Sequence, residues 1–248
     1  MKIAACQMPH IHNDPQRALS LIVSNATDAQ HRGVRLVCFP ECFLQGYDVC
    51  MEHVDEVAID TGSSEFSRIL ESLSGLEPVI VVGMIERERN RFYNTAVAID
   101  HGRLVARYRK THLLKGEQTV FEAGEDYPVF DVCGITIGIN ICYDLNFPEA
   151  ITGAARAGAR LVACPCNNMM RRSSAEQWKF RHNEIRARRA REEGVWLLSS
   201  DVTGESNDRI SYGPTAVIDP NGMVVDQVPL MTTGVIVVDI GGGRSGEQ

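Results

Sequence analysis

The feature that most constrains the fold is an internal repeat between the two halves of the chain. Residues 31–41 and 156–166 share an order of signals: a glycine, an apolar run and a proline. Residues 95–102 and 215–222 share a second pattern, a Thr-Ala-Val strand that runs into an aspartate and a Gly-containing turn. The two pairs lie 125 and 120 residues apart, so the register is nearly kept. Because this spacing is much longer than a solenoid period, it predicts two similar α/β halves.

The two halves are expected to bury their sheets against each other. Each half combines apolar strands with amphipathic helices, so each sheet has helices on one face and an apolar surface on the other. Face-to-face packing then gives a four-layer α-β-β-α sandwich with two similar mixed-sheet halves. Helix–strand alternation alone would also suit a doubly wound fold, but predicted hairpins at 94–108 and 213–228 favour mixed sheets. We predict a single domain over residues 1–240 and a flexible Gly-rich tail at 241–248.

Hydrophobic periodicity and turn residues locate the individual elements. Strands are predicted at 2–8, 34–39, 78–83, 94–100, 103–108, 129–132, 135–141, 160–164, 195–199, 213–219, 223–228 and 235–240. Helices are predicted after a cap at Asp14, and at 64–74, 148–157 and 174–193. Residues 114–127 are predicted to form a polar loop.

Composition argues against several classes of function. The net charge of -7 disfavours binding to nucleic acid or to an anionic membrane, and no apolar run is long enough to span a bilayer. The N-terminus resembles a short strand and not a secretion signal, so we expect a cytoplasmic protein. The eight cysteines should then be free, and because no Cys-x-x-Cys motif occurs we expect neither a metal site nor a cofactor.

A cysteine at a predicted strand end is the first candidate for chemistry. The apolar run 135–141 stops at Cys142, and polar residues and Pro148 follow directly, as where a buried strand leads into a helix N-terminus. Backbone N–H groups at such a turn would favour a thiolate and later an oxyanion. Taken alone, Cys142 would more often be a buried core thiol.

Two further groups stand at strand or hairpin ends. Glu41 directly follows the apolar strand 34–39, at the strand end where open α/β sheets place their chemistry, and Lys110 follows the first hairpin. A thiol nucleophile needs a base and an oxyanion donor. His112 lies next to Lys110 and could also be that base, so the residues leave Cys–His and Cys–Glu–Lys arrangements open.

At this point the chain resembles the nitrilase, or carbon–nitrogen hydrolase, superfamily, and the likeness is to its amidase and carbamoylase branches. Four motifs in matching order and spacing, over nearly the whole chain, make the resemblance specific. They are Phe39-Pro-Glu41 with Gly46-Tyr47, Tyr108-Arg-Lys110-Thr-His-Leu113, Glu117 with Phe121 and Gly124, and Cys142-Tyr-Asp144 with Phe147-Pro-Glu149.

The resemblance implies a role for each matching residue. Glu41 would be the general base, Lys110 would stabilise the oxyanion, and Cys142 would be the nucleophile. Glu117 would orient the lysine and the substrate amine or water, and the backbone N–H of Tyr143 would be the second oxyanion donor. The implied reaction is ping-pong hydrolysis: the thiol attacks an amide carbon, the amine leaves, and water cleaves the thioester.

The resemblance also narrows the substrate. Nitrilases resemble Cys-Trp-Glu at the nucleophile, whereas Cys142-Tyr-Asp144 is more similar to amidases and carbamoylases, which implies small linear amides such as ω-amides or N-carbamoyl amines. The alternatives are nitrile hydrolysis, acyl transfer to an amine, or a non-catalytic binding or regulatory role. Asn167, Asn168 and Met169 follow the strand that repeats the one before Glu41, so we expect them to line the substrate pocket.

The predicted helix 174–193 is rich in arginine. Glutamates alternate with the arginines, which favours a solvated or subunit-contacting face over a nucleic-acid site. Family members usually dimerise through this region, so the resemblance implies a homodimer or larger homo-oligomer.

Overall fold

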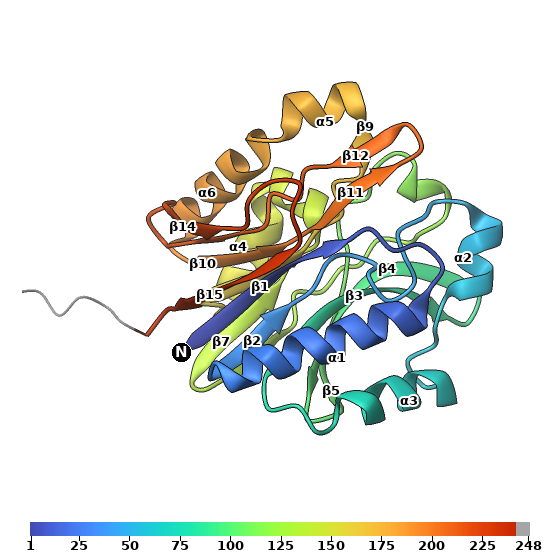
Figure 1. Cartoon of the computed structure of the whole chain (residues 1–248), viewed down its shortest axis with the longest axis horizontal. Coiled ribbons are helices and arrows are strands. Elements are labelled where there is room, and N and C mark those ends of the chain that lie inside the picture. Colours follow the sequence, from blue (N-terminus) through green and yellow to red (C-terminus); the bar gives the residue numbers. More distant parts are fainter. Residues whose placement is uncertain (242–248) are drawn as a thin grey trace, which may run out of the picture.

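The computed structural model describes residues 1–241, which form two mixed β-sheets covered by helices (Figure 1). The strands are β1 (Lys2–Pro9), β2 (Val34–Cys38), β3 (Val79–Glu88), β4 (Arg91–Asp100), β5 (Arg103–Arg109), β6 (Val129–Val132), β7 (Ile135–Ile139), β8 (Leu161–Pro165), β9 (Met170–Arg171), β10 (Trp196–Ser200), β11 (Val202–Ser206), β12 (Arg209–Ser211), β13 (Ala216–Ile218), β14 (Val224–Gln227) and β15 (Gly234–Asp239). The helices are α1 (Pro15–His31), α2 (Met51–Val57), α3 (Ser64–Leu73), α4 (Pro148–Arg156), α5 (Arg172–Trp178) and α6 (Arg181–Glu193), with 3₁₀ turns η1 (Glu117–Thr119) and η2 (Cys142–Asn146).

The predicted repeat is present as two sheets with the same topology. One sheet contains the order β5-β4-β3-β2-β1, and the other contains β14-β13-β10-β8-β7. In the first sheet β1, β2 and β3 are parallel, and β4 and β5 continue the sheet as antiparallel strands. In the second sheet β7, β8 and β10 are parallel, and β13 and β14 continue it in the same antiparallel way. The prediction of two similar mixed-sheet halves is therefore confirmed.

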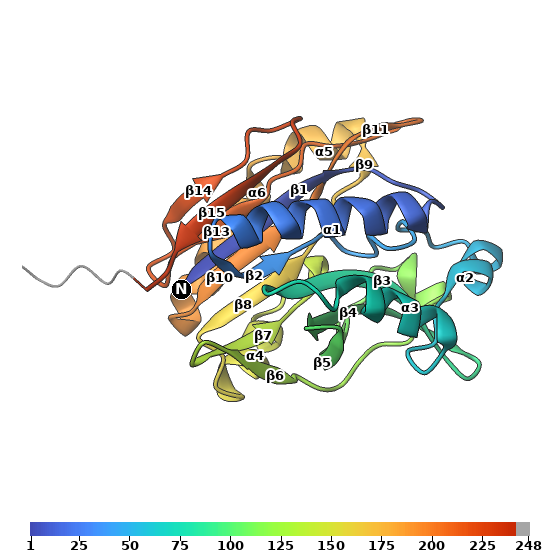
Figure 2. The same cartoon turned by 60° about the horizontal axis from the view of Figure 1, so that its bottom comes forward.

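Three apolar layers separate the four layers of the sandwich. Alternate residues of β1 show the division: Ile3 and Ala5 face the second sheet, whereas Ala4 and Cys6 pack beneath helices. Helices α1 and α3 cover the outer face of the first sheet (Figure 2), and α4 and α6 cover that of the second. This arrangement follows from the period-2 alternation of the strands, which makes both faces of each sheet apolar.

The predicted helix 174–193 is wrong as a single element. It is two helices, α5 and α6, separated at residues 179–180. Helix α5 packs on β9 and β12, whereas α6 packs on β10, β13 and α4. One straight helix cannot lie on both surfaces, so tertiary packing overrides a sequence pattern that runs through the break.

The expectation of a solvated arginine face is also wrong for two residues of α6. Arg186 and Arg189 are buried, with 3% and 5% of their surface exposed. Arg189 donates to the carbonyl of Leu145, and Arg186 enters a polar cluster described below. Arg181, Arg188 and Arg191 are exposed, as expected.

Some strands had no clear signal in the sequence. Strands β9, β11 and β12 extend the first sheet beyond β1, and β3 runs on to form a hairpin with β4. None of the helices within residues 1–241 combines the length and apolar character needed to cross a membrane. The predicted tail lies outside the described residues except for Gly241.

Candidate active site

The candidate residues lie where strands of both sheets end. Glu41 is in the turn after β2, and Lys110 directly follows β5. Gly83 of β3 makes room for the Glu41 turn, because a Cβ there would lie 2.3 Å from the backbone nitrogen of Cys42. The internal repeat places the end of β8 opposite, where the Glu41 N–H donates to the carbonyl of Cys166 at 3.2 Å. The polar site therefore forms where the two halves of the repeat meet.

Lys110 is the centre of a buried ionic cluster. Its Nζ donates to Glu41 Oε1 at 2.7 Å and to Glu117 Oε1 at 2.8 Å, and all three side chains are at most 1% exposed. Asn94 of β4 donates from one Nδ2 to the same two oxygens, at 2.7 and 3.0 Å. An ammonium has three protons, so two are engaged here and one is left for another acceptor.

The two carboxylates differ in their second oxygen. Glu117 Oε2 accepts from the backbone N–H of Leu114 at 2.7 Å, which fixes that side chain. Glu41 Oε2 is buried and has no hydrogen-bond partner among the described residues. Buried polar atoms normally have a partner, and an unsatisfied one needs an explanation. A proton acceptor that waits for a substrate-linked proton would provide it.

Burial and charge act in opposite directions on this cluster. Burial raises the pKa of Glu41, although the charge of Lys110 opposes the shift. Burial alone would lower the pKa of Lys110, but the charges of Glu41 and Glu117 outweigh it and raise that pKa well above its usual value. Lys110 is therefore a cation, and Glu41 binds a proton more readily than an exposed glutamate, as a base must.

Cys142 lies on a strained turn shortly after β7. Its φ is +42°, in the left-handed region that residues other than glycine seldom adopt, and η2 begins at this residue. The N–H of Tyr143 lies in the first turn of η2, where backbone N–H groups have no acceptor within the helix. The thiol donates to Asn168 Oδ1 at 3.7 Å.

The resting thiol differs from the thiolate expected from its place at a helix start. Contact with the Cys166 thiol, burial and the charge of Glu41 together raise the pKa of Cys142 well above its usual value, and Lys110 only partly opposes them. Cys142 is therefore protonated at neutral pH. Attack by its sulfur requires a nearby base.

Asp144 joins the Cys142 turn to the loop after Lys110. Its Oδ2 accepts from the N–H of Ile141 and from the Tyr108 hydroxyl, both at 2.8 Å. Its Oδ1 accepts from the N–H groups of Thr111 and His112, at 3.2 and 2.8 Å. Asp144 is thus a positioning residue that holds the thiol turn and the lysine loop in one geometry.

His112 is held by contacts with residues other than Cys142. Its ring stacks on Phe147 with centroids 4.1 Å apart, and its Nδ1 pairs with Thr111 Oγ1 at 2.9 Å. A hydrogen bond with Asp144 raises its pKa. Within residues 1–241 it has no hydrogen bond to Cys142, so the geometry favours the Cys–Glu–Lys arrangement over Cys–His.

A cavity of about 500 Å³ opens above Cys142. Asn167, Asn168 and Met169, which were expected to line the substrate pocket, are among the residues around it. Its other lining residues are Tyr47, Leu114, Tyr143, Leu145, Asn146, Met170, Arg171, Ser174, Trp178, His182, Ile185, Arg186 and Arg209. Trp178 of α5 and Ile185 of α6 are among these residues, so both helices contribute to the cavity wall. The cavity has a largely apolar wall and a polar region at the thiol.

A second polar cluster lies on the far side of the thiol, and sequence reasoning missed it. Asp201 accepts from the backbone N–H of Asn168 at 3.0 Å and also from its side-chain amide. Arg186 Nη2 donates to Cys166 Sγ at 3.0 Å and lies 3.5 Å from Asp201 Oδ2. These contacts fix Asn168 and Cys166 beside Cys142.

Two of the missed residues had a signal in the sequence. Asp201 follows an apolar strand as Glu41 does, and Asn94 interrupts the apolar pattern at the start of an alternating strand. Arg186 had none, since an arginine among glutamates on a helix is usually solvated.

The layers and sheets of this chain match those of nitrilase-superfamily amidases. It superposes on a solved structure of an amidase from Nesterenkonia sp. AN1 with a TM-score of 0.83 and 27% identity, covering 97% of this chain and 93% of that one. That structure is of a glutamate-to-glutamine mutant showing the result of Michael addition of acrylamide at the active site cysteine. The fold therefore defines the class as amidases of this superfamily.

Sequence comparisons agree with the structural match. The chain is 29% identical over 243 residues to a nitrilase of Pyrococcus abyssi, covering 97% of this chain and 89% of that protein. It is 27% identical over 230 residues to an (R)-stereoselective amidase of Pseudomonas sp., covering 91% and 80%. The family model for carbon–nitrogen hydrolases matches residues 2–247, so the chain belongs to that family. It is an amidohydrolase that acts on carbon–nitrogen bonds other than peptide bonds.

Proposed function

We propose that the protein hydrolyses small linear amides, either ω-amides or N-carbamoyl amines, through a thioester on Cys142. The observation that carries this proposal is the buried Glu41–Lys110–Glu117 cluster, whose charges act on a thiol that lines the cavity. A partly buried thiol with a raised pKa is inert alone. Beside a carboxylate with a free oxygen and an ammonium with a free proton, it can react.

The steps follow from these contacts. Glu41 Oε2 takes the thiol proton as the sulfur attacks the amide carbon, and the oxyanion is stabilised by the third Lys110 proton and the Tyr143 N–H. Glu41 then returns the proton to the leaving nitrogen, the C–N bond breaks, and a thioester remains. Water, oriented by Glu117 and deprotonated by Glu41, cleaves the thioester to release the acid and regenerate the thiol.

The cavity favours substrates whose far end is acidic. Arg171 and Arg209 lie at its exposed edge, and within the described part of the chain Arg209 has no ion-pair partner. Its Nη1 donates only to the carbonyl of Met169, at 3.2 Å. An ω-amide of a dicarboxylic acid would place its amide at Cys142 and its carboxylate near these guanidinium groups.

Replacing Arg209 with alanine is expected to raise KM for an ω-amide acid about tenfold with little change in kcat, since a charged hydrogen bond contributes about 1.5 kcal/mol. Steady-state kinetics on an ω-amide acid and on a neutral amide of equal length would check this, and only the acid should respond. Arg172→Ala is a matched control, because this neighbouring arginine pairs with Glu205 and does not line the cavity. Equal effects on both substrates would contradict a carboxylate contact.

The pH profile should show the raised pKa of Glu41. The base works only when it is deprotonated, so kcat/KM should fall as the pH drops through a pKa above the ordinary glutamate value of about 4.3. The pKa of Lys110 is raised, so it should not produce an alkaline fall near neutrality. A profile of kcat/KM, with circular dichroism at each pH to confirm folding, measures both limbs. An acid midpoint at or below the ordinary value would contradict the assignment.

Ammonia release over a panel of ω-amides, aliphatic amides, carbamoyl amines and nitriles tests the function itself. Turnover of nitriles alone would favour the alternative of nitrile hydrolysis. The similarity to a nitrilase of Pyrococcus abyssi is a reason to test it. Hydroxamate formation with added hydroxylamine would show acyl transfer. No turnover together with slow, unselective alkylation of Cys142 would favour a binding or regulatory role.

We further propose that residues 1–240 form one cytoplasmic domain that assembles as a homodimer or larger. Met223, Val224 and Val225 are exposed on and beside β14, an edge strand of the second sheet, and apolar edge strands are usually covered. A monomer by light scattering at micromolar concentration would count against assembly.

A further inference from the structure

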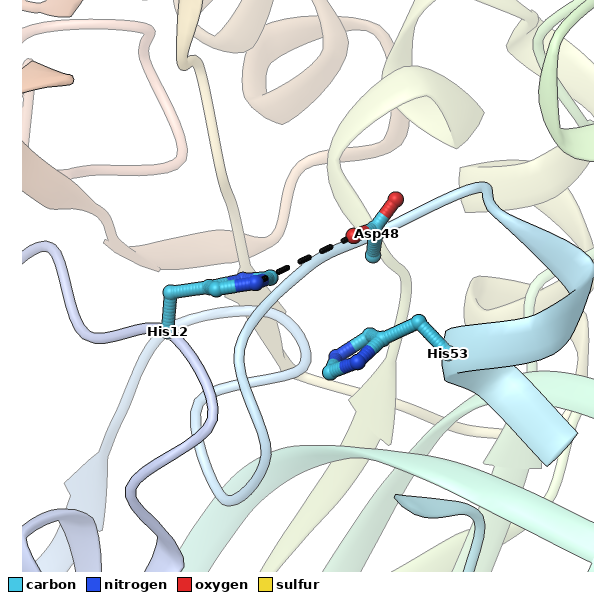
Figure 3. A group of neighbouring side chains, drawn as sticks. All are labelled: His12, Asp48 and His53. Carbon is cyan, nitrogen blue, oxygen red and sulfur yellow. Dashed lines mark ion pairs between the residues drawn. The ribbon is translucent and has the colours of Figure 1, made fainter. Parts of the chain in front are cut away.

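Two loops bring three metal-ligating side chains together away from Cys142 (Figure 3). His12 comes from the loop between β1 and α1, Asp48 from the segment before α2, and His53 from α2 itself. One ligand atom of each lies within 4.8 Å of the others. The imidazole rings are stacked with centroids 4.8 Å apart, and His12 Nε2 is 4.0 Å from Asp48 Oδ2. The three side chains thus surround one small space.

Internal hydrogen bonds do not account for this cluster. The distance between His12 and Asp48 is too long for a hydrogen bond. His53 Nε2 is buried and has no partner among the described residues, although buried polar atoms normally have one. Asp48 Oδ1 accepts from the N–H groups of Val49 and Cys50 at 2.7 and 2.9 Å, which orients the carboxylate. Such outer hydrogen bonds are typical of metal-ligating carboxylates.

We propose that His12, Asp48 and His53 bind a divalent transition metal of the zinc class. Two imidazoles and one carboxylate suit zinc and its neighbours, whereas calcium and magnesium prefer all-oxygen sites. Ligand atoms about 2.0–2.2 Å from a tetrahedral ion are about 3.3–3.6 Å apart, so ligand atoms that lie within 4.8 Å of one another must close by at most roughly 1.5 Å. His12 is half exposed and free to make that movement, and the fourth position is left to water.

The expectation of no metal site came from the absence of a Cys-x-x-Cys motif. A search for cysteine motifs cannot detect a site built from histidine and aspartate. Its ligands come from residues 12, 48 and 53, which have no regular spacing and meet only because the two loops pack together. The N–H of Asn13 donates to the carbonyl of Gln45 at 2.9 Å, and a Cβ at Gly46 would lie 2.7 Å from the carbonyl oxygen of Ile11. A bound ion would tie these loops more firmly.

The loop that would be tied carries part of the cavity wall. Tyr47, which directly precedes Asp48, lines the cavity above Cys142. A metal at this cluster would therefore hold Tyr47 in place. Loss of the metal should raise KM without abolishing turnover. This consequence rests on the proposed function, whereas the metal site itself does not.

Metal binding can be measured without any enzyme assay. Chelator-treated Cys142→Ala protein, in which the catalytic thiol cannot compete, is titrated with Zn²⁺ by calorimetry and followed by thermal unfolding. We expect one high-affinity site per chain, a higher unfolding temperature with Zn²⁺, and no comparable effect of Mg²⁺. His12→Ala and Asp48→Asn in the same background should weaken binding at least about tenfold and remove the thermal shift.

Matched variants decide between this site and adventitious binding. His101→Ala removes an exposed histidine that lies 2.6 Å from Asp100 on the β4–β5 turn, and it should change nothing. Cys50→Ser tests whether the neighbouring exposed thiol is responsible instead. The proposal is overturned if no stoichiometric binding occurs, or if binding survives in His12→Ala and Asp48→Asn variants that remain folded. Failure of the amide panel would leave the binding result unaffected.

Discussion

Cys142→Ala is expected to reduce amide hydrolysis by roughly 10⁴- to 10⁶-fold, the scale on which loss of a covalent nucleophile acts in hydrolases. The reason is that no other group at the cavity can form the thioester. Because alanine keeps the cavity open, the variant should still bind substrate, which equilibrium binding would show. The same substitution removes a protonated thiol with a raised pKa, so little change in folding stability is expected.

Alkylation supplies an independent readout of the same prediction. Because Glu41 can accept the thiol proton during attack, fluoroacetamide should modify Cys142 much faster than the exposed Cys50 and Cys133, as peptide mass mapping would reveal. Cys133→Ala is the matched control and should leave hydrolysis unchanged. Full activity in Cys142→Ala, or labelling confined to the two exposed cysteines, would overturn the mechanism.

Lys110→Met should produce the second large effect, a fall of about 10²–10³ in kcat from the lost oxyanion donor. It should also destabilise the fold by about 3–5 kcal/mol at neutral pH, because Glu41 and Glu117 are left buried without a counterion. Steady-state kinetics and denaturant unfolding measure the two effects separately. Lys115→Met, at an exposed lysine of the same loop, is the matched control.

The pH dependence of stability distinguishes lost charge from lost packing. Burial raises the pKa of Glu41 and Lys110 opposes that shift, so without the lysine the folded-state pKa should rise further. A carboxyl with a raised folded-state pKa favours folding in its protonated form. The variant should therefore be most stable at acid pH and lose stability as the pH rises through that pKa. A deficit that does not depend on pH would show that packing is responsible.

Much of the fold could be predicted because its signals are local. Apolar and alternating runs mark β1 to β8, β10 and β13 to β15, and the repeat between 31–41 and 156–166 indicates how they are grouped. The prediction of one long helix over residues 174–193 was wrong, because the break between α5 and α6 depends on which surface each of these two helices covers. The short strands β9, β11 and β12 also had no local pattern, because pairing with neighbours defines them.

The candidate site was predictable to a smaller extent. Glu41, Lys110 and Cys142 stand at strand ends, and the motif resemblance added Glu117. Their charge states required coordinates: the thiol was expected to be a thiolate, but its surroundings raise its pKa. Asp201 and Asn94 act through hydrogen bonds to residues distant in sequence, so only the structure shows what they hold.

The sequence by itself determined the two-fold repeat, the alternation of strands, and the residue types that end them, because these depend on side-chain periodicity and turn chemistry. The tertiary structure decided which strand ends meet. Packing of the two sheets brings Glu41 beside Cys166, buries Lys110 between two carboxylates, and turns Arg186 inward. These outcomes depend on distance and burial, and both arise only when segments far apart in the chain share one low-dielectric interior.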